Sequence, residues 1–372
     1  MRKIPKWLQG ILFLLLAYFL FFFRLPLYLE VPGNIFSLDE MIEVENQSVD
    51  TPGEFYITTV GIQQLTPATI GRSFFPYQDL VSEAELFGEY DDFESYNRLQ
   101  KYYMESSINH AIKAAFDAAG KDYDFEYNGV HVLQITKDSN FSGKLEMGDL
   151  VKAVDGNDFD SSTEFIDYIA GKNVGDQTNL TIERDGESLN LTGQLIELES
   201  GKTGIGIALV DHTKIITDPT VRVEAGTIGG PSAGLMFSLE LYTKIIDHNI
   251  RKDFNIAGTG TIDSEGKVGR IGGIEKKVIA ADRENIDYFF APDDDLSEEY
   301  LKINPGQQSN YELALDTVKE IESDMVIVPV KTIMDAIEYL ENLQLKEKVF
   351  KEGKFISLHE DQNESEKFLL VA

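Results

Sequence analysis

A serine stands between a glycine-rich turn and an apolar run in the stretch GGPSAGLMFSLELY, residues 229–242. Its core fits G-x-S-x-G, the pattern of a hydrolase nucleophile elbow. Pro231 suits the first turn of a helix, where free backbone N–H groups can stabilise an oxyanion. The stretch alone leaves two roles open for Ser232: a nucleophile, or an N-cap that stabilises the helix by about 1 kcal/mol.

A serine nucleophile needs a base, and the sequence offers two kinds. An α/β-hydrolase triad requires a histidine after the serine, and the only histidines there are His248 and His359. His248 follows one short helix later, and His359 lies close to the C-terminus, so neither is well placed. The other kind of base is a lysine whose amine is kept neutral by burial.

One lysine of the segment GGIEKKVIAADREN has the required setting. Ile274, Lys277, Val278 and Ala281 recur at i, i+3, i+4 and i+7 and therefore share one helical face. Lys276 is expected to point toward solvent. Desolvation on the apolar face would lower the pKa of Lys277, whereas a lysine that only covers apolar surface with its stem would keep its ammonium in water. The helix alone leaves both readings of Lys277 open.

The elements that must position these side chains alternate after residue 198. The segments FNIAGTGTI, IDYFFAP and MVIVPV are typical of strands, and SAGLMFSLELYTKII and TIMDAIEYLENL are typical of helices. Between Tyr127 and Glu197 the pattern changes to short strands with turn signals at Asp155-Gly156 and Asp185-Gly186. This order predicts an α/β or α+β domain preceded by a compact β-rich module.

The first 30 residues differ from the rest. Arg2, Lys3 and Lys6 precede an apolar segment from Trp7 to about Leu27, roughly the 20 residues that a bilayer requires. No small-x-small cleavage site follows, which favours an uncleaved anchor over a signal peptide. The positive-inside rule then places the N-terminus in the cytoplasm and the catalytic part outside. We therefore expect a single-pass protein of the cell membrane.

Composition excludes several classes of function. The 372-residue chain has a formal net charge of −31, and nucleic-acid binding needs a basic surface instead. Without cysteine, the chain has no disulfide, thiolate zinc site or cysteine nucleophile. The tripeptide GKT at 201–203 lacks the first glycine of a P-loop, because Ile196 occupies that position. We expect no metal, no cofactor, no nucleotide and no nucleic-acid partner.

The segments GGPSAGL and AGTGTIDSEGKVGRIGGIEKKVIAA together resemble the proteolytic domain of Lon-type proteases, which use a Ser–Lys dyad. The resemblance implies Ser232 as nucleophile, Lys277 as base, and Thr259 as the hydroxyl that hydrogen-bonds the lysine. YYMESSINHAIKAAF and PVKTIMDAIEYL resemble the first long helix and the last strand and helix of that domain. Gly229 replaces the acid that often precedes Gly-Pro-Ser in Lon. The supporting residues implied by the same motif are Gly230, Pro231 and Ala233.

Residues 127–197 resemble a PDZ domain. Gly148-Asp149-Leu150, followed by the turn at Asp155-Gly156, matches the Gly-Asp-hydrophobic strand of that family. The carboxylate-binding loop would then fall on NGVHV, which departs from the usual glycine-flanked pattern, whereas addition of a peptide as an extra strand fits it. The peptide-binding residues implied are Gly129, Val130, His131 and Val132.

These features predict an α+β fold: a Lon-type proteolytic domain with an inserted PDZ-like β-rich module and one N-terminal transmembrane helix. The combination resembles the membrane-anchored, SepM-like, pheromone-processing proteases of Gram-positive bacteria. It implies an ATP-independent serine endopeptidase that acts on exported peptides or small membrane-tethered proteins. The alternatives are a catalytically inactive PDZ peptide-binding scaffold and an esterase of the α/β-hydrolase type. The expected divisions are an anchor (1–30), the first part of the protease domain (31–126), the PDZ-like module (127–197), the catalytic part (198–344) and a tail (345–372).

Overall fold

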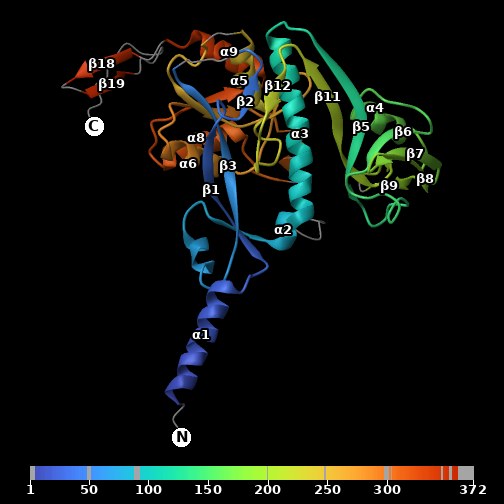
Figure 1. Cartoon of the computed structure of the whole chain (residues 1–372), viewed down its shortest axis with the longest axis horizontal. Helices are drawn as coiled ribbons and strands as arrows, with labels where there is room; N and C mark the ends of the chain where they lie inside the picture. The colour runs from blue at the N-terminus through green and yellow to red at the C-terminus, as the bar shows by residue number, and fades with distance from the viewer. Residues whose placement is uncertain are drawn as a thin grey trace.

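The computed structural model describes residues 5–47, 52–87, 93–198, 200–246, 249–296, 301–302, 304–344, 347–351 and 354–358. In Figure 1 an N-terminal helix leads into a mixed α+β portion, and a separate β-rich module lies on the other side of the long helix α3. This arrangement agrees with the α+β class expected from the sequence.

A six-stranded sheet forms the centre of the α+β portion, with the order β17-β16-β13-β3-β1-β4. The strand β13 pairs in parallel with β3 and β16, and β16 pairs in parallel with β17, whereas β1 runs antiparallel to β3 and β4. Parallel neighbours need crossover connections, and helices supply them between β13, β16 and β17. The strands are β1 (Leu27–Ser37), β3 (Glu54–Gln64), β4 (Asp79–Ser82), β13 (Asn255–Gly258), β16 (Tyr288–Pro292) and β17 (Val326–Val330).

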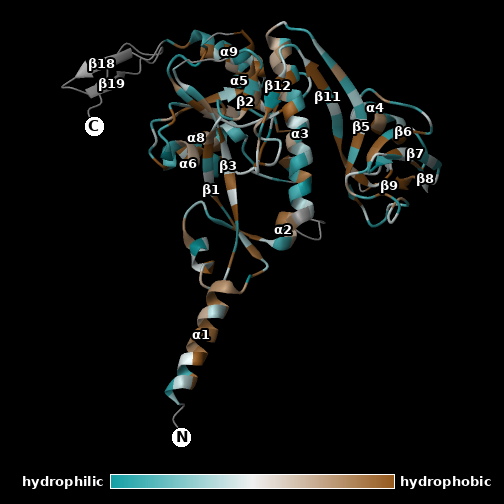
Figure 2. Cartoon of the chain, in the orientation of Figure 1, coloured by the Kyte–Doolittle hydropathy of each residue, from teal (hydrophilic) through white to brown (hydrophobic). Residues whose placement is uncertain are grey.

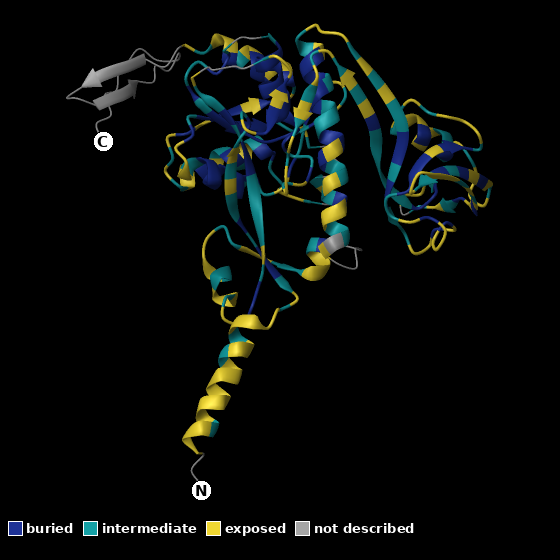
Figure 3. Ribbon diagram, viewed as in Figure 1, coloured by how far each residue is buried: buried dark blue, intermediate teal, exposed yellow. Residues whose placement is uncertain are grey.

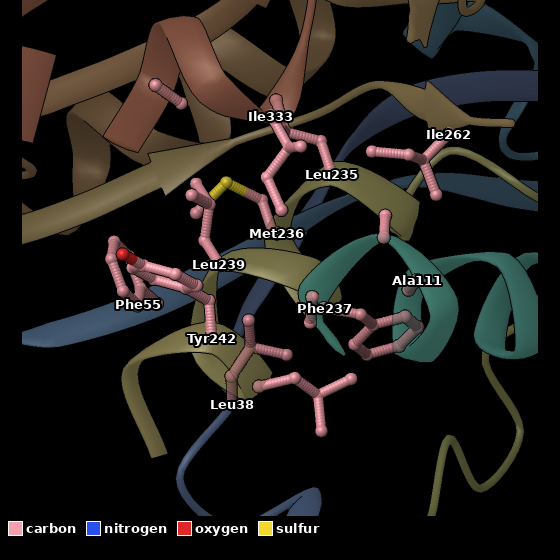
Figure 4. Packing of buried hydrophobic residues seen from close by; sticks show 14 of the residues in the cluster. Leu38, Phe55, Ala111, Leu235, Met236, Phe237, Leu239, Tyr242, Ile262 and Ile333 are labelled. Carbon is pink, nitrogen blue, oxygen red and sulfur yellow. The ribbon is translucent and has the colours of Figure 1, made fainter. Parts of the chain in front are cut away.

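Helices cover both faces of this sheet. Along β16, Tyr288 and Phe290 belong to the core shared with α3, α5 and α9, whereas Phe289 and Ala291 belong to the core shared with α6 and α8. This alternation is the two-residue period of a strand buried on both sides. The helices are α3 (Phe93–Ala118), α5 (Gly234–Ile246), α6 (Ile274–Arg283), α8 (Asn310–Glu320) and α9 (Ile333–Asn342). Figure 4 shows the first of these cores, where α5 packs against Ala111 of α3 and Phe55 of β3.

The helix α5 is buried from its first residue to Ile245, including its polar side chains. Figure 3 shows it in dark blue in the upper part of the α+β portion, at the place where Figure 1 labels α5. A helix that is apolar nearly all round is stable only inside a core. The turn that precedes α5 is therefore held in place by the packing of the whole helix. Short paired elements near it are β2 (Ile42–Val44), β12 (Val221–Val223), β14 (Thr261–Ile262) and β15 (Val268–Gly269).

The β-rich module contains a five-stranded sheet with the order β11-β5-β6-β7-β8 and one helix, α4 (Ser162–Ala170). A separate apolar cluster fills it, so the module has its own core. The last strand, β11, ends at Thr217, so the module extends beyond the Glu197 boundary expected from the sequence. The strands are β5 (Tyr123–Ile135), β6 (Leu150–Val154), β7 (Gln177–Arg184), β8 (Glu187–Gln194) and β11 (Ile207–Thr217), with the short pair β9 (Ile196–Glu197) and β10 (Thr203–Gly204).

The sequence predicts a carboxylate-binding loop at residues 129–132, and this prediction is wrong because these residues form part of a strand. These residues lie within β5, where Val130 pairs with Asp211 of β11 on one side and with Val151 of β6 on the other. Val130 and Val132 are fully buried in the core of the module. A strand paired on both edges has no free backbone to bind a peptide terminus.

The N-terminal helix α1 runs from Lys6 to Phe22 and is apolar along most of its length (Figure 2). Pro26 disfavours helix for the residue before it, and β1 begins at Leu27. Seventeen residues of helix span about 26 Å, less than the roughly 30 Å of a hydrocarbon core. Among the described residues, no helix is long and apolar enough to cross a membrane. The transmembrane helix expected from Trp7 to about Leu27 is thus not found.

Two short segments complete the fold, one after β3 and one near the C-terminus. After β3 the chain forms a short 3-10 helix, η1 (Ile70–Phe74), and then β4 and α2 (Glu83–Phe87). In the segment expected as a tail, β18 (Glu347–Lys351) and β19 (Lys354–Leu358) pair as an antiparallel hairpin. Residues 359–372 lie outside the described part of the chain.

Candidate active site

Ser232 lies in the turn just before α5, and the long helix α3 holds this turn in place. The carbonyl of Gln100 accepts a hydrogen bond from the Gly230 N–H at 2.9 Å, and the Ser107 hydroxyl donates to the Pro231 carbonyl at 3.0 Å. Gly230 has a φ of 91°, a conformation that other residues rarely adopt. Gln100 and Ser107 are seven residues apart on one helical face, so a single element fixes the backbone on the N-terminal side of Ser232.

Gly229 occupies the position where Lon proteases often carry an acid, and the structure explains the glycine. A Cβ atom at this position would lie 2.6 Å from the Cβ of Gln100. Any larger residue would push the turn away from α3. The missing acid is therefore a consequence of how closely α3 approaches the turn.

Lys277 brings its amine to the serine from the opposite side. Its Nζ lies 2.8 Å from the Ser232 Oγ and 2.9 Å from the Thr259 Oγ1. The lysine is only 4% exposed, whereas Ser232 is partly exposed and open to a substrate. The structure thus brings together the three side chains that the sequence singled out, across 45 residues of chain between Ser232 and Lys277.

Thr259 orients the amine through the direction of its own hydrogen bond. Its hydroxyl donates to the Ser232 carbonyl at 3.0 Å, so its oxygen is left to accept from Lys277. The Gly260 N–H donates to the same carbonyl at 2.8 Å. The turn after β13 therefore positions the serine backbone and the lysine amine together.

Burial lowers the pKa of Lys277 from its ordinary value of 10.5 to about 7. Desolvation penalises the ammonium form, and among the described residues no carboxylate pairs with it. A substantial fraction of the amine is neutral at pH 7. In that form its lone pair accepts the Ser232 O–H, while one of its own hydrogens remains with Thr259.

The helix α6 follows the register expected from the sequence. Ile274, Val278 and Ala281 are fully buried in the core between α6, α8 and the sheet, and Lys277 shares their burial. Gly273 precedes the helix with a φ of 65°, in the left-handed region that favours glycine.

Lys276 does not point toward solvent, and that expectation is wrong. The residue is 4% exposed, and its Nζ lies 2.5 Å from Asp79 of β4 and 3.4 Å from Glu30 of β1. Burial acts to lower the pKa of Lys276, but the hydrogen bond and charge of Asp79, aided by Glu30, outweigh it and raise the pKa. Lys276 therefore stays charged and ties α6 to the edge of the sheet.

The N-cap alternative for Ser232 is not what the structure shows. The helix α5 begins at Gly234, and the Phe237 N–H donates to the Ala233 carbonyl, so Ser232 lies before the cap position. Within the described chain, no backbone carbonyl accepts from the N–H groups of Ser232 and Ala233. These two groups are free to donate to a negatively charged oxygen beside the serine.

The histidines considered as alternative bases, His248 and His359, lie outside the described residues. The histidine expected in a peptide-binding loop, His131, instead lies between the rings of Tyr102 (tilted by 39°) and His212 (edge-on at 68°), each with centroids 4.6 Å away, and its Nε2 is hydrogen-bonded to the His212 Nδ1 at 3.1 Å. Burial and the charge of His212 lower the pKa of His131 to about 4. His131 thus connects the module to α3 through Tyr102, and none of these contacts involves Ser232.

Gln100 and Ser107 are the residues that sequence reasoning missed. Their spacing on a helix is visible in the sequence, but nothing there shows that this face of α3 meets the Gly-Gly-Pro-Ser turn. That contact joins residues 124 positions apart for Ser107 and Pro231.

Comparison with known families finds two domain matches in the chain. Residues 105–195 match the PDZ domain model, and residues 179–335 match the model of the Lon protease (S16) C-terminal proteolytic domain. The overlap, 179–195, lies in β7 and β8 of the module sheet. Ser232, Thr259 and Lys277 all lie within the second match.

Similar proteins are Lon proteases and PDZ domains. The chain is 32% identical over 174 residues to the Lon protease of Campylobacter jejuni, covering 41% of this chain and 20% of that protein. It is 31% identical over 173 residues to the Lon protease of Methanosphaera stadtmanae, covering 43% of this chain and 19% of that protein. A solved PDZ domain of an SdrC-like protein from Listeria monocytogenes is 38% identical, with a TM-score of 0.22, and covers 23% of this chain and 90% of that structure.

The match to the curated Lon proteases thus spans about a fifth of their length. The family match over residues 179–335 includes the strand, turn and helices that carry the serine, the threonine and the lysine. The chain therefore carries a PDZ domain together with a serine peptidase domain of the Lon type.

Proposed function

We propose that the protein is an ATP-independent serine endopeptidase in which Ser232 is the nucleophile and Lys277 the general base. The observation that carries this proposal is the buried amine of Lys277, which lies 2.8 Å from one hydroxyl and 2.9 Å from another and faces no carboxylate in the described chain. A buried lysine with a structural role usually pairs with carboxylates, whereas this amine contacts only hydroxyl groups among the described residues.

The first half of the reaction follows from these contacts. Neutral Lys277 accepts the Ser232 hydroxyl proton as the Oγ forms a bond to the carbonyl carbon of a peptide substrate. The carbonyl π electrons move to its oxygen, and the free N–H groups of Ser232 and Ala233 donate to the resulting oxyanion. Thr259 holds the amine in line throughout.

In the second half, the ammonium of Lys277 returns its proton to the leaving nitrogen as the C–N bond breaks. An acyl group remains on Ser232. A water molecule then gives a proton to the amine and attacks the ester carbon, and the serine oxygen leaves with that proton. The base is neutral again at the end, so the cycle needs no cofactor.

The test is cleavage of unfolded casein by the purified chain. We expect Ser232→Ala to fold and to lose cleavage by at least about 1,000-fold. Ser238→Ala is the matched control, because this serine lies in α5, the helix that Ser232 precedes, and its hydroxyl donates to the Leu235 carbonyl. Equal cleavage by wild type and Ser232→Ala would exclude the proposed nucleophile. A folded wild-type chain without cleavage would favour the inactive peptide-binding scaffold.

We propose further that the PDZ module recruits peptide or protein substrates and that the protein works at the outer face of a cell membrane, as SepM-like proteases do. The apolar side chains of α1 support membrane attachment, because they are exposed on all sides; Trp7, for example, is 68% exposed. Phe74 (90% exposed) and Phe75 (61%) lie at the end of η1, in the segment that follows Ala68, and the Ala68 N–H bonds to the Leu20 carbonyl near the end of α1. Exposed apolar surface of this kind marks an interaction site.

Protease added to intact, wall-stripped cells tests this location. We expect digestion of the region after residue 30 while a cytosolic control protein remains intact. Protection of that region until the membrane is permeabilised would contradict the orientation. Recovery of the chain in the soluble fraction would contradict membrane attachment itself.

A further inference from the structure

The short helix η1 carries apolar side chains that the fold itself does not use. Phe74 is 90% exposed, Phe75 is 61% exposed, and Ile70 at the start of the helix is 39% exposed. In the described chain, none of the three belongs to an apolar cluster. Water disfavours two adjacent exposed aromatic rings, so this surface indicates an interaction site.

These side chains project from an ordered turn. Within residues 66–75, several N–H groups donate to carbonyls three or four positions earlier, as from Arg72 to Thr69 and from Phe75 to Arg72. The Ser73 hydroxyl donates to the Ile70 carbonyl at 2.9 Å. Backbone groups that are bonded within a segment lose little when they leave water. The turn can therefore approach a lipid phase at low cost.

The segment that leads into η1 is fixed to the end of α1. The Ala68 N–H donates to the Leu20 carbonyl at 3.0 Å, and the Gln64 side-chain amide donates to the Leu25 carbonyl at 3.2 Å. Figure 1 shows η1 as the short blue helix next to the C-terminal end of α1, at the opposite end of the α+β portion from α9. The apolar helix and the aromatic turn therefore share one end of the molecule.

Charge also distinguishes this end of the molecule. The chain has 64 acidic residues, but residues 1–29 and 55–78 contain none, and these are its two longest stretches without one. They include Arg24, which is exposed, and Arg72, whose guanidinium donates to the Gln63 side chain. Among the described residues, neither arginine pairs with a carboxylate. A chain with a net charge of −31 is repelled by an anionic surface unless it approaches with such an end.

We propose that η1 is a second membrane contact, which inserts Phe74 and Phe75 into an anionic lipid surface while Arg24 and Arg72 lie beside its phosphate groups. The proposal rests on the membrane attachment proposed above, and it adds a contact outside α1 and a lipid class. Apolar groups bound in this way lie about 5 to 10 Å into the boundary between headgroups and acyl chains. Two separate contacts restrict the tilt of the α+β portion on the membrane, which one helix does not.

The test places one tryptophan at a time in the full chain, reconstituted in vesicles of phosphatidylcholine and phosphatidylglycerol with bromine on part of the acyl chains. Trp7 is the only tryptophan, so Phe74→Trp in a Trp7→Phe background reports on η1 alone. We expect brominated lipid to quench its fluorescence, more with bromine near the headgroup than near the chain end. Met334→Trp in the same background is the matched control and should not be quenched, because Met334 is 51% exposed but lies in α9.

The wild-type chain distinguishes this proposal from membrane attachment as such. Quenching of Trp7 without quenching of Phe74→Trp would overturn the second contact and leave attachment through α1 intact. Absence of quenching in both would overturn both proposals. Protection of Phe74→Trp from aqueous iodide without quenching by lipid would show a protein partner and overturn the lipid assignment. Phe75→Trp is the second reporter if Phe74→Trp fails to fold.

The lipid class is tested in the same background. An arginine near an anionic surface favours contact by about 5-fold, so Phe74→Trp should be quenched less in vesicles without phosphatidylglycerol. Arg24→Gln combined with Arg72→Gln should remove this difference, whereas Arg222→Gln, exposed on β12, should preserve it. High salt should also reduce it. Equal quenching in the two kinds of vesicle would overturn the assignment to anionic lipid.

Discussion

Two lysines follow each other on α6 and are buried to the same extent, yet their surroundings have opposite effects. Lys276 faces Asp79 and Glu30 at the edge of the sheet, and these carboxylates raise its pKa. Among the described residues, Lys277 faces only the hydroxyls of Ser232 and Thr259, and burial lowers its pKa to about 7. Burial by itself does not make a lysine a base.

The difference lies in the charge that surrounds the amine. A buried ammonium with carboxylate partners is a structural tie, whereas one without partners gives up its proton. A hydroxyl still offers hydrogen bonds, so the neutral amine of Lys277 remains positioned. Helix α6 thus presents one lysine for stability and one for chemistry, and the following predictions test this contrast.

Replacement of the uncompensated lysine has the largest expected effect. Lys277→Met should lower casein cleavage by about 10²- to 10⁴-fold, because no other base is in contact with Ser232 among the described residues. Lys276→Met should retain most of the activity. Equal loss in both variants would show that the two lysines do not differ in role.

The same variant should change the pH dependence of stability. The unfolded chain binds a proton at Lys277 up to about pH 10.5, and the folded chain releases it above about 7. The free energy of unfolding of the wild type should therefore gain a rising contribution between about pH 7 and 10.5, which Lys277→Met lacks. Below pH 7 the variant should be the more stable protein. Urea unfolding across this range measures the difference, and parallel curves would contradict it.

An acid placed beside Lys277 should give this lysine a carboxylate partner, as Lys276 has, and raise its pKa. In Thr259→Asp, the new carboxylate should raise the pKa of Lys277 by about 1 to 3 units. Wild-type activity should rise with pH through about 7, whereas the variant should lose about 10- to 1,000-fold at pH 7 and regain activity only at higher pH. Thr259→Asn, which lacks the charge, controls for the lost hydroxyl. An unshifted pH profile in Thr259→Asp would contradict the account.

The smallest effect is expected for the compensated lysine. Asp79 is 64% exposed on its side chain, so solvent screens its pair with Lys276. Lys276→Met should lower the free energy of unfolding by at most about 1 kcal/mol, and the loss should shrink at high salt. Because the pKa of Lys276 is raised, its contribution should persist at neutral pH and fade only above about pH 10.5. If Lys276→Met instead raised the free energy of unfolding at low salt, Lys276 would not be a stabilising residue.

The sequence contained much of the site because its signals are local. Ser232 stands in a short motif, and the 3.6-residue period of α6 selects Lys277 for the core side. Lys276 was misassigned because its partner Asp79 lies 197 residues away in the chain. The residues around His131 were misassigned because β11, which pairs with them, begins only at Ile207. Pairings between distant segments are decided by packing, which periodicity does not reveal.

The central claim is that the amine of Lys277 loses its proton near pH 7, and its direct measurement is an NMR titration. Lysines labelled with ¹³C at Cε report their own protonation, and comparison with Lys277→Met assigns the signal. We predict that one lysine signal titrates with a pKa of about 7 and that it vanishes in Lys277→Met but persists in Lys276→Met. If the Lys277 signal instead titrates near 10.5 with the surface lysines, it cannot be the base that activates Ser232.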